Sequence, residues 1–216
     1  MEAPTQWTPG LVDEPLCLRS VRTAYLLDLD GTLTTVELLP LIAREVGLEQ
    51  RVADLTRRTM AGELAFYDSL RRRVEMLADV PLATVHEIVS SVPVHEQLLG
   101  WARQRADQCW IVTSNLDVWI SPLLARLGLP AYSSTAHVEN GRVCLDTVLV
   151  KPDVLADFAT WRTVMVGDGA NDAGIMAQAD IGVASALMHP PAPVVIEAAD
   201  YLALEEETLC HLLSRL

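Results

Sequence analysis

Five short segments along the chain are continuously apolar or β-branched, and each ends close to an Asp, Ser or Gly. Continuous apolar runs of this length are typical of strands that are covered on both faces. Helical patterns lie between most of them, and such alternation predicts an α/β fold with a doubly wound parallel sheet. The predicted strands span residues 24–29, 110–113, 164–166, 181–183 and 201–204.

Apolar positions at helical spacing predict the connecting elements. The clearest helix stops at Gly128, a residue type that often follows the last turn of a helix. The predicted helices span residues 116–127, 153–161, 172–178 and 205–216. A β-hairpin is predicted at residues 138–143, because Asn140-Gly141 between alternating segments is typical of a two-residue turn.

One long segment, residues 36–93, carries helical patterns throughout and no strand pattern. It separates the first two predicted strands and is too long for an ordinary crossover connection. We therefore expect a small all-helical cap, inserted after the first strand and lying over the carboxyl edge of the sheet. The predicted divisions are a Pro-rich, flexible leader at 1–20, a catalytic core at 21–35 and 94–216, and the cap at 36–93.

Composition excludes several classes of protein. Half of the 216 residues are hydrophobic and 21% are charged, which is a globular composition. The net charge of −13 argues against nucleic acid as a partner. The only basic run, Arg71-Arg72-Arg73, lies in a helical pattern and is most simply a solvated face.

The expected cellular compartment is inferred from features that the sequence does not contain. It has no signal-like leader and no apolar run of about 18 residues, so we expect a cytoplasmic protein without membrane contact. Cys17, Cys109, Cys144 and Cys210 are far apart and show no metal-ligand spacing, which favours reduced thiols over a disulfide framework.

Polar clusters follow the predicted strands, at the edge where open α/β sheets bind ligands. The first is LLDLDGTL, in which Asp28 and Asp30 end an apolar strand. Two carboxylates about 4 Å apart repel by roughly 4 kcal/mol in a surface-like dielectric, so a cation or a reaction must offset the arrangement. The other clusters are VTSN at 112–115, the isolated Lys151, and VGDGAND at 166–172. Oxygen ligands in this number suit Mg²⁺.

The four clusters in this order resemble the motifs of the haloacid dehalogenase superfamily of aspartate-nucleophile phosphohydrolases. The resemblance implies a Rossmann-like core, a Mg²⁺ cofactor and an aspartyl-phosphate intermediate. It implies that Asp28 is the nucleophile and that Asp30 is the acid and base. Thr113 and Lys151 would then hold the phosphoryl oxygens.

The same resemblance assigns the metal site and its surroundings. Asp168 would ligate Mg²⁺ together with Asp28 and the Asp30 carbonyl. Asp172 would support these ligands, and Asn171 would face the substrate.

Within the superfamily, the cap is similar to that of the phosphoserine phosphatases. Glu37 matches the glutamate that receives the substrate ammonium, and Arg73 matches the arginine that grips its carboxylate. Met60 and Phe66 match the apolar wall of that pocket. The implied partner is a small phosphorylated metabolite, phosphoserine or a related amino-acid-like phosphate, with a place in serine biosynthesis.

The chain departs from that pattern at Ser114-Asn115, where these phosphatases have paired glycines. Side chains here could reshape the contact with substrate, and Ser114 becomes a candidate substrate-binding residue. The segment between the hairpin and GDGAND is also shorter. Both departures leave phosphatase chemistry in place and leave the identity of the phosphomonoester open.

Simpler roles stay open for several candidates. Asp172 could cap a helix, Thr113 could be an ordinary strand-end hydroxyl, and Lys151 could be solvated. Glu37 could be a first-turn helix residue, Arg73 could be solvated, and Met60 and Phe66 could be core. Two other functions are also open: transfer of the phosphoryl group to an alcohol, and a phosphoaspartate signalling module. Oligomeric state is not predicted.

Overall fold

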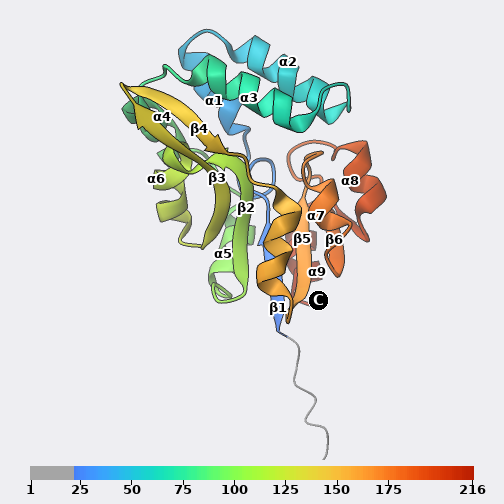
Figure 1. Ribbon diagram of the computed structural model, residues 1–216. Coiled ribbons are helices and arrows are strands. Elements are labelled where there is room, and N and C mark those ends of the chain that lie inside the picture. Colours follow the sequence, from blue (N-terminus) through green and yellow to red (C-terminus); the bar gives the residue numbers. More distant parts are fainter. Residues whose placement is uncertain (1–21) are drawn as a thin grey trace, which may run out of the picture.

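A seven-stranded sheet forms the centre of the computed structural model, which describes residues 22–216 (Figure 1). The predicted leader at 1–20 and Cys17 lie outside the described residues. The strand order is β4-β3-β2-β1-β5-β6-β7, with β4 antiparallel to β3 and the remaining pairs parallel. The strands are β1 (Thr23–Leu27), β2 (Cys109–Leu116), β3 (Ala131–Glu139), β4 (Arg142–Thr147), β5 (Arg162–Gly167), β6 (Ile181–Ser185) and β7 (Tyr201–Ala203).

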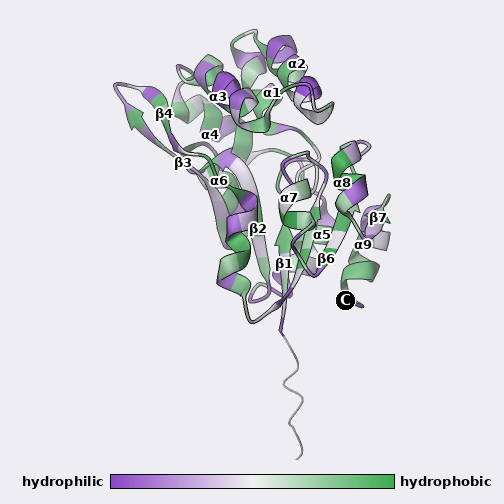
Figure 2. Ribbon diagram, turned by 45° about the vertical axis from the view of Figure 1, so that its right-hand side comes forward, coloured by the Kyte–Doolittle hydropathy of each residue, from purple (hydrophilic) through white to green (hydrophobic). Residues whose placement is uncertain are grey.

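Helices cover both faces of the sheet, as the apolar runs predict. Along β1, Tyr25 and Leu27 belong to one buried cluster, and Ala24 and Leu26 belong to another. The first cluster includes residues of α5 (Glu96–Arg103), α6 (Asp117–Leu127) and α9 (Glu206–Leu213); the second includes residues of the 3₁₀ helix η1 (Lys151–Phe158), α7 (Ala173–Met176) and α8 (Pro193–Ala198). The predicted doubly wound α/β fold is confirmed. The strand in the middle of the sheet is β1, and the hydropathy colours show it as mainly apolar (Figure 2).

Two local predictions need correction. The predicted first strand, 24–29, ends at Leu27, so Asp28 and Asp30 lie in the loop that follows it. The predicted helix at 153–161 is the 3₁₀ helix η1, which begins at Lys151. The hairpin is present: Asn140 and Gly141 both have positive φ, 51° and 81°, as a type I′ turn requires.

Four helices connect β1 to α5 and lie above the carboxyl edge of the sheet (Figure 1). They are α1 (Leu38–Glu45), α2 (Glu49–Met60), α3 (Phe66–Leu77) and α4 (Leu82–Ser90). The chain enters and leaves this segment side by side, through a bridge between Thr34 and Val94. We call α1–α4 the cap; its treatment as a separate domain stays a prediction. None of the helices in residues 22–216 has the length and apolar character needed to cross a bilayer.

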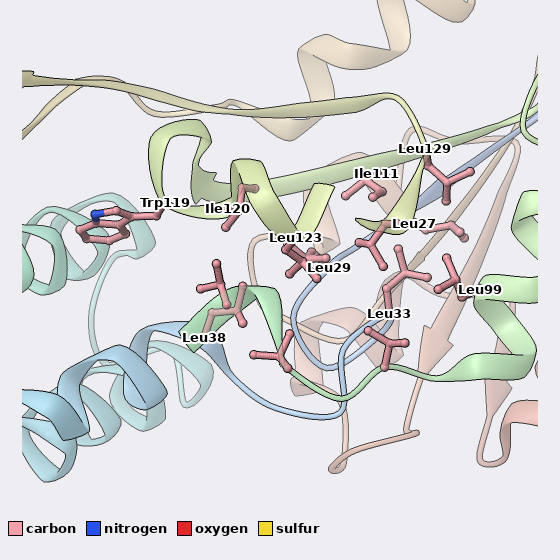
Figure 3. Packing of buried hydrophobic residues seen from close by; sticks show 14 of the residues in the cluster. Leu27, Leu29, Leu33, Leu38, Leu99, Ile111, Trp119, Ile120, Leu123 and Leu129 are labelled. Atoms are coloured by element: carbon pink, nitrogen blue, oxygen red, sulfur yellow. The ribbon is translucent and has the colours of Figure 1, made fainter. Parts of the chain in front are cut away.

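The loop after β1 is anchored by its leucines. Leu29 and Leu33 have no exposed surface and lie in the same cluster as Leu27 and Leu38 (Figure 3). Burying such a side chain contributes about 1.5–3 kcal/mol. The apolar residues of LLDLDGTL therefore hold the loop in the core and fix the positions of the carboxylates between them.

Candidate active site

The two carboxylates of the first loop face different partners. Asp28 is buried, and its backbone N–H donates to the Val166 carbonyl of β5 at 2.9 Å. The carboxylate of Asp30 accepts from the backbone N–H of Leu38, the first residue of α1, at 2.8 Å. The side-chain amide of Asn115 also donates to Asp30. One carboxylate is thus turned to the core of the site, and the other is fixed between α1 and β2.

A close approach of two loops explains the glycine of DLDGT. Gly31 has φ of +73°, and a Cβ at this position would lie 2.8 Å from a carboxylate oxygen of Asp168. Thr32 donates its hydroxyl to Asp168 at 3.2 Å. A side chain at residue 31 would therefore displace Asp168, the acid that follows β5.

Lys151 links the first loop to the GDGAND loop. Its ammonium lies 2.6 Å from Asp28 Oδ1 and 2.5 Å from Asp172 Oδ1, and all three side chains are buried. The other oxygen of Asp172 accepts from the backbone N–H groups of Asp168 and Gly169 at 3.1 and 2.9 Å. Asp172 makes no side-chain cap to α7, so it supports the loop and Lys151 instead.

Negative charge exceeds positive charge in this cluster. Oxygen atoms of Asp28, Asp168 and Asp172 lie within 4.8 Å of one another, and Lys151 supplies one ammonium. Burial, and then Asp172, raises the pKa of Asp28 well above its usual range, although Lys151 opposes this. Burial lowers the pKa of Lys151, but Asp172 and Asp28 outweigh it and raise the pKa above its usual range. The donor set and its charge fit a hard divalent cation bound by oxygen.

The pKa of Asp30 is also raised, again mainly by burial. Burial, with Glu37 as the next cause, raises the pKa of Asp30 to about 8, against the hydrogen bond from Leu38. A carboxyl group with a pKa near neutrality can give up and take back a proton at working pH.

Hydroxyl and amide groups from the end of β2 complete the floor of the site. Thr113 is buried, and its hydroxyl accepts from the backbone N–H of Asn115 at 3.1 Å. The Ser114 hydroxyl accepts from the side-chain amide of Asn171 at 3.3 Å. The VTSN and GDGAND motifs are therefore in direct contact.

A single pocket joins this floor to the cap. Most of the predicted site residues line it: Asp28, Asp30, Glu37, Phe66, Arg73, Thr113, Ser114, Asp168 and Asn171. Lys151 contacts both Asp28 and Asp172, and neither Lys151 nor Asp172 lines the pocket. Met60 ends α2, and its side chain lies outside the described part of the structure.

Arg73 differs from its two neighbours in the basic run. Arg71 and Arg72 are exposed, as a solvated face predicts, whereas Arg73 is 6% exposed. Its guanidinium donates to Thr56 Oγ1 at 3.1 Å and to the Ser69 carbonyl at 3.3 Å. Within residues 22–216 no carboxylate lies within 4.0 Å of it, and burial lowers its pKa. A buried guanidinium without an anion at the wall of a pocket favours an anionic group in the ligand.

Sequence reasoning missed three residues of the site. Thr32 and Asn115 lie within or beside the quoted motifs, and their side chains contact Asp168 and Asp30. His189 comes from the segment after β6 and lies 3.5 Å from Glu37 and 3.3 Å from Asp168. The hydrogen bond with Glu37 and the charge of Asp168 raise the pKa of His189 to about 9, against burial. No motif in the sequence signals this histidine.

Comparison with known proteins agrees with this geometry. The model of the haloacid dehalogenase-like hydrolases matches residues 25–177. The chain is 30% identical over 204 residues to a phosphoserine phosphatase of Methanocaldococcus jannaschii, covering 87% of this chain and 94% of that protein. It is 33% identical over 174 residues to a phosphoserine phosphatase of Vibrio cholerae, covering 73% of this chain and 53% of that protein.

Solved structures resemble the whole arrangement. A substrate-bound phosphoserine phosphatase superimposes with a TM-score of 0.76 and 26% identity, covering 90% of this chain and 98% of that one. A phospho-aspartyl intermediate analogue of phosphoserine phosphatase gives a TM-score of 0.75 at 26% identity, with 91% and 99% covered. Together with the family match over most of the sheet and the whole cap, these findings identify the chain as a member of the haloacid dehalogenase-like hydrolase family.

Proposed function

We propose that the chain is a Mg²⁺-dependent phosphatase of small amino-acid-like phosphomonoesters, with phosphoserine as the first candidate. The observation that carries the proposal is one pocket with Asp28, Asp30 and Asp168 on its floor and Glu37 and Arg73 on its walls. The relatives' names, which are those of phosphoserine phosphatases, support the same substrate class.

In the first step, a carboxylate oxygen of Asp28 attacks the phosphorus of the ester. The new Asp28 O–P bond forms as the P–O bond to the alcohol breaks, and Asp30 gives its proton to the leaving oxygen. The hydrogen bonds from Leu38 and Asn115 hold Asp30 in position for this transfer. Lys151 donates to one carboxylate oxygen of Asp28, holds the side chain in place and offsets the charge of the carboxylate.

In the second step, Asp30 takes a proton from a water molecule whose oxygen attacks the same phosphorus. The Asp28 O–P bond then breaks, and inorganic phosphate leaves. Mg²⁺, held by the carboxylates of Asp28 and Asp168 and the Asp30 carbonyl, would supply positive charge against the phosphoryl oxygens. Thr113 and Ser114 line the pocket beside Asp28 and can donate to the same oxygens.

Substrate selection would come from charge on the cap side. Arginine presents the two-pronged geometry that a carboxylate needs, and Glu37 supplies an anion for an ammonium group. Glu37 already has His189 at 3.5 Å, so an incoming ammonium would share this carboxylate with the imidazole. A substrate that lacks the carboxylate therefore tests the role of Arg73, and one that lacks the ammonium tests the role of Glu37.

The proposal is tested with a small panel of phosphates. Phosphoserine is compared with phosphoethanolamine, which lacks the carboxylate, with phosphoglycerate, which lacks the ammonium, and with p-nitrophenyl phosphate. We expect phosphoserine to have the highest kcat/KM. Equal kcat/KM for all four would contradict the substrate assignment and leave the phosphatase chemistry intact. Adding acceptor alcohols and measuring new ester against free phosphate separates hydrolysis from transfer.

Removal of the metal gives a second prediction. After treatment with EDTA, turnover of any substrate in the panel should fall by at least about a hundredfold, because the charge that offsets the phosphoryl oxygens is lost. Adding Mg²⁺ in excess should restore it. Full activity in EDTA would contradict the proposed metal site.

Arg73→Ala should separate substrate binding from chemistry. Loss of a charge-assisted pair costs about 1.5–3 kcal/mol, so KM for phosphoserine should rise about 10- to 100-fold. KM for p-nitrophenyl phosphate, which has no carboxylate, should change little. The neighbouring exposed arginine provides the matched control, Arg72→Ala, which should leave both values unchanged. An equal rise for both substrates would remove Arg73 from the substrate pocket.

A further inference from the structure

The hairpin formed by β3 and β4 carries a group of polar side chains far from the catalytic motifs in sequence. His137 lies directly opposite Cys144 in the antiparallel pair, and Glu139 lies opposite Arg142. Because side chains alternate along a strand, His137 and Glu139 share a face, and Cys144 and Asp146 share the same face of the partner strand. One face of the hairpin therefore presents an imidazole, a thiol and two carboxylates.

Three of these groups converge on one point. A ring nitrogen of His137, the sulfur of Cys144 and a carboxylate oxygen of Glu139 all lie within 4.8 Å of one another. Cys144 is a free thiol. Zinc binds nitrogen and oxygen at about 2.0–2.2 Å and sulfur at about 2.3 Å, so the three groups can share one ion after small side-chain rotations.

Asp146 holds one of the two ring nitrogens of His137. Its Oδ1 lies 2.7 Å from Nδ1 of His137. A carboxylate only accepts, so Nδ1 carries the proton and Nε2 keeps a lone pair. A carboxylate that holds one ring nitrogen while the other faces a metal is the usual support of a zinc-binding histidine.

Arginine and lysine side chains do not neutralise the carboxylates of this cluster. Arg142, opposite Glu139, donates its guanidinium to Asp79 and Glu75 of the cap region. Among residues 22–216 no lysine or arginine nitrogen lies within 4.0 Å of the carboxylates of Glu139 or Asp146. Among the described residues the Glu139 carboxylate has no cationic partner of this kind and is available to a cation from solution.

We infer that this face of the hairpin binds a divalent transition metal, of which zinc is the best match, through His137, Cys144 and Glu139, with Asp146 positioning the imidazole. A thiolate and an imidazole favour zinc over Mg²⁺, which prefers oxygen ligands throughout. The Cys144 S–H bond would break as the metal–sulfur bond forms, with the proton released to solvent. Water completes the coordination, because the site is open to solvent.

The position of the site suggests its effect. The backbone N–H of Val143, next to Cys144, donates to the Ala78 carbonyl at the end of α3, at 2.9 Å. Arg142 pairs with the same region. A metal that joins β3 to β4 would therefore brace the part of the hairpin on which the cap rests. The inference is independent of the proposed phosphatase function.

The test uses the full chain, stripped with EDTA, dialysed, and titrated with zinc by calorimetry in excess Mg²⁺. The Asp28→Asn variant is titrated in parallel, so that binding at the catalytic carboxylates is separated from binding at the hairpin. We expect one zinc per chain in both proteins. His137→Ala and Cys144→Ser should each weaken binding at least about tenfold, and Asp146→Asn about 10- to 100-fold. Cys210→Ser, a half-buried thiol on α9, is the matched control and should bind as the parent does.

Two further readouts identify the ligands. Co²⁺ should give a thiolate charge-transfer band in the parent and in Cys210→Ser, and none in Cys144→Ser. Zinc should raise the Tm of the parent but not that of the His137→Ala/Cys144→Ser double variant, whose circular dichroism shows whether it is folded. Absence of stoichiometric zinc in the parent, or unchanged affinity in the folded double variant, overturns the inference.

Discussion

Asp28→Asn should reduce phosphatase turnover by about a thousandfold or more, the scale expected when a nucleophile is removed. An amide has nearly the same shape as a carboxylate but cannot form the acyl phosphate. The variant should stay folded, because Lys151 keeps its ion pair with Asp172. The substitution also removes the repulsion between the carboxylates of Asp28 and Asp172. The Tm is therefore expected to be equal to or above that of the parent.

Two measurements check this result. Initial rates with phosphoserine and p-nitrophenyl phosphate give the loss of kcat, and mass spectrometry of the quenched parent during turnover looks for one phosphoryl group on Asp28. Asp153→Asn is the control: this exposed aspartate lies two residues from Lys151 and should leave kcat unchanged. If the folded Asp28→Asn variant kept more than about a hundredth of the parent's activity, Asp28 would not be the nucleophile.

Lys151→Met should have the largest effect on stability. Removing one partner of a buried ion pair leaves an uncompensated charge, which costs about 3–5 kcal/mol. Here one ammonium serves both Asp28 and Asp172, and all three side chains are buried. We expect the free energy of unfolding in EDTA, measured with urea, to fall by about this amount.

The matched control for Lys151→Met is an exposed ion pair. Arg22 pairs with Asp107 at 3.1 Å with both side chains exposed, so Arg22→Met should cost no more than about 1 kcal/mol. The deficit of Lys151→Met should also depend on pH. The pKa of Asp28 is already raised in the folded state, and loss of Lys151 raises it further, so the folded variant binds a proton that the unfolded chain does not. The deficit should therefore shrink as the pH falls below neutrality, and an equal deficit at all pH values would contradict this account.

The centre of the sheet could be predicted because its strands β1, β2, β5 and β6 are buried on both faces. Continuous apolar runs such as YLL in β1 and VMV in β5 have few other stable solutions. The first part of β3 was missed, because Ala131–Glu139 mixes small and polar residues and only its end carries the Asn-Gly signal. The 3₁₀ form of η1 was also missed, since apolar spacing in a short segment does not distinguish two kinds of helix.

Most of the candidate motifs could be placed in one site from strand direction, because DLDGT and GDGAND follow parallel strands, VTSN lies at the end of another, and these carboxyl ends face the same edge. Lys151 follows the antiparallel strand β4, so strand direction does not place it. Residues that reach the site only through the tertiary structure could not be predicted from the sequence. His189 reaches Glu37 and Asp168 from a segment without a motif, and His137 meets Cys144 only through strand pairing. The run Arg71-Arg72-Arg73 shows the same limit: its composition suggests a solvated face, and only the packing of α3 separates the buried Arg73 from its exposed neighbours.

The buried ammonium of the site has a consequence for chemical labelling. Lys151 is the only lysine among the 216 residues, and it is 2% exposed. The folded surface thus offers no side-chain amine to acylating reagents or to isopeptide-forming conjugation. Acylation of Lys151 would therefore report directly that the floor of the pocket has opened. It would be measured as a mass shift of the one tryptic peptide that contains this lysine.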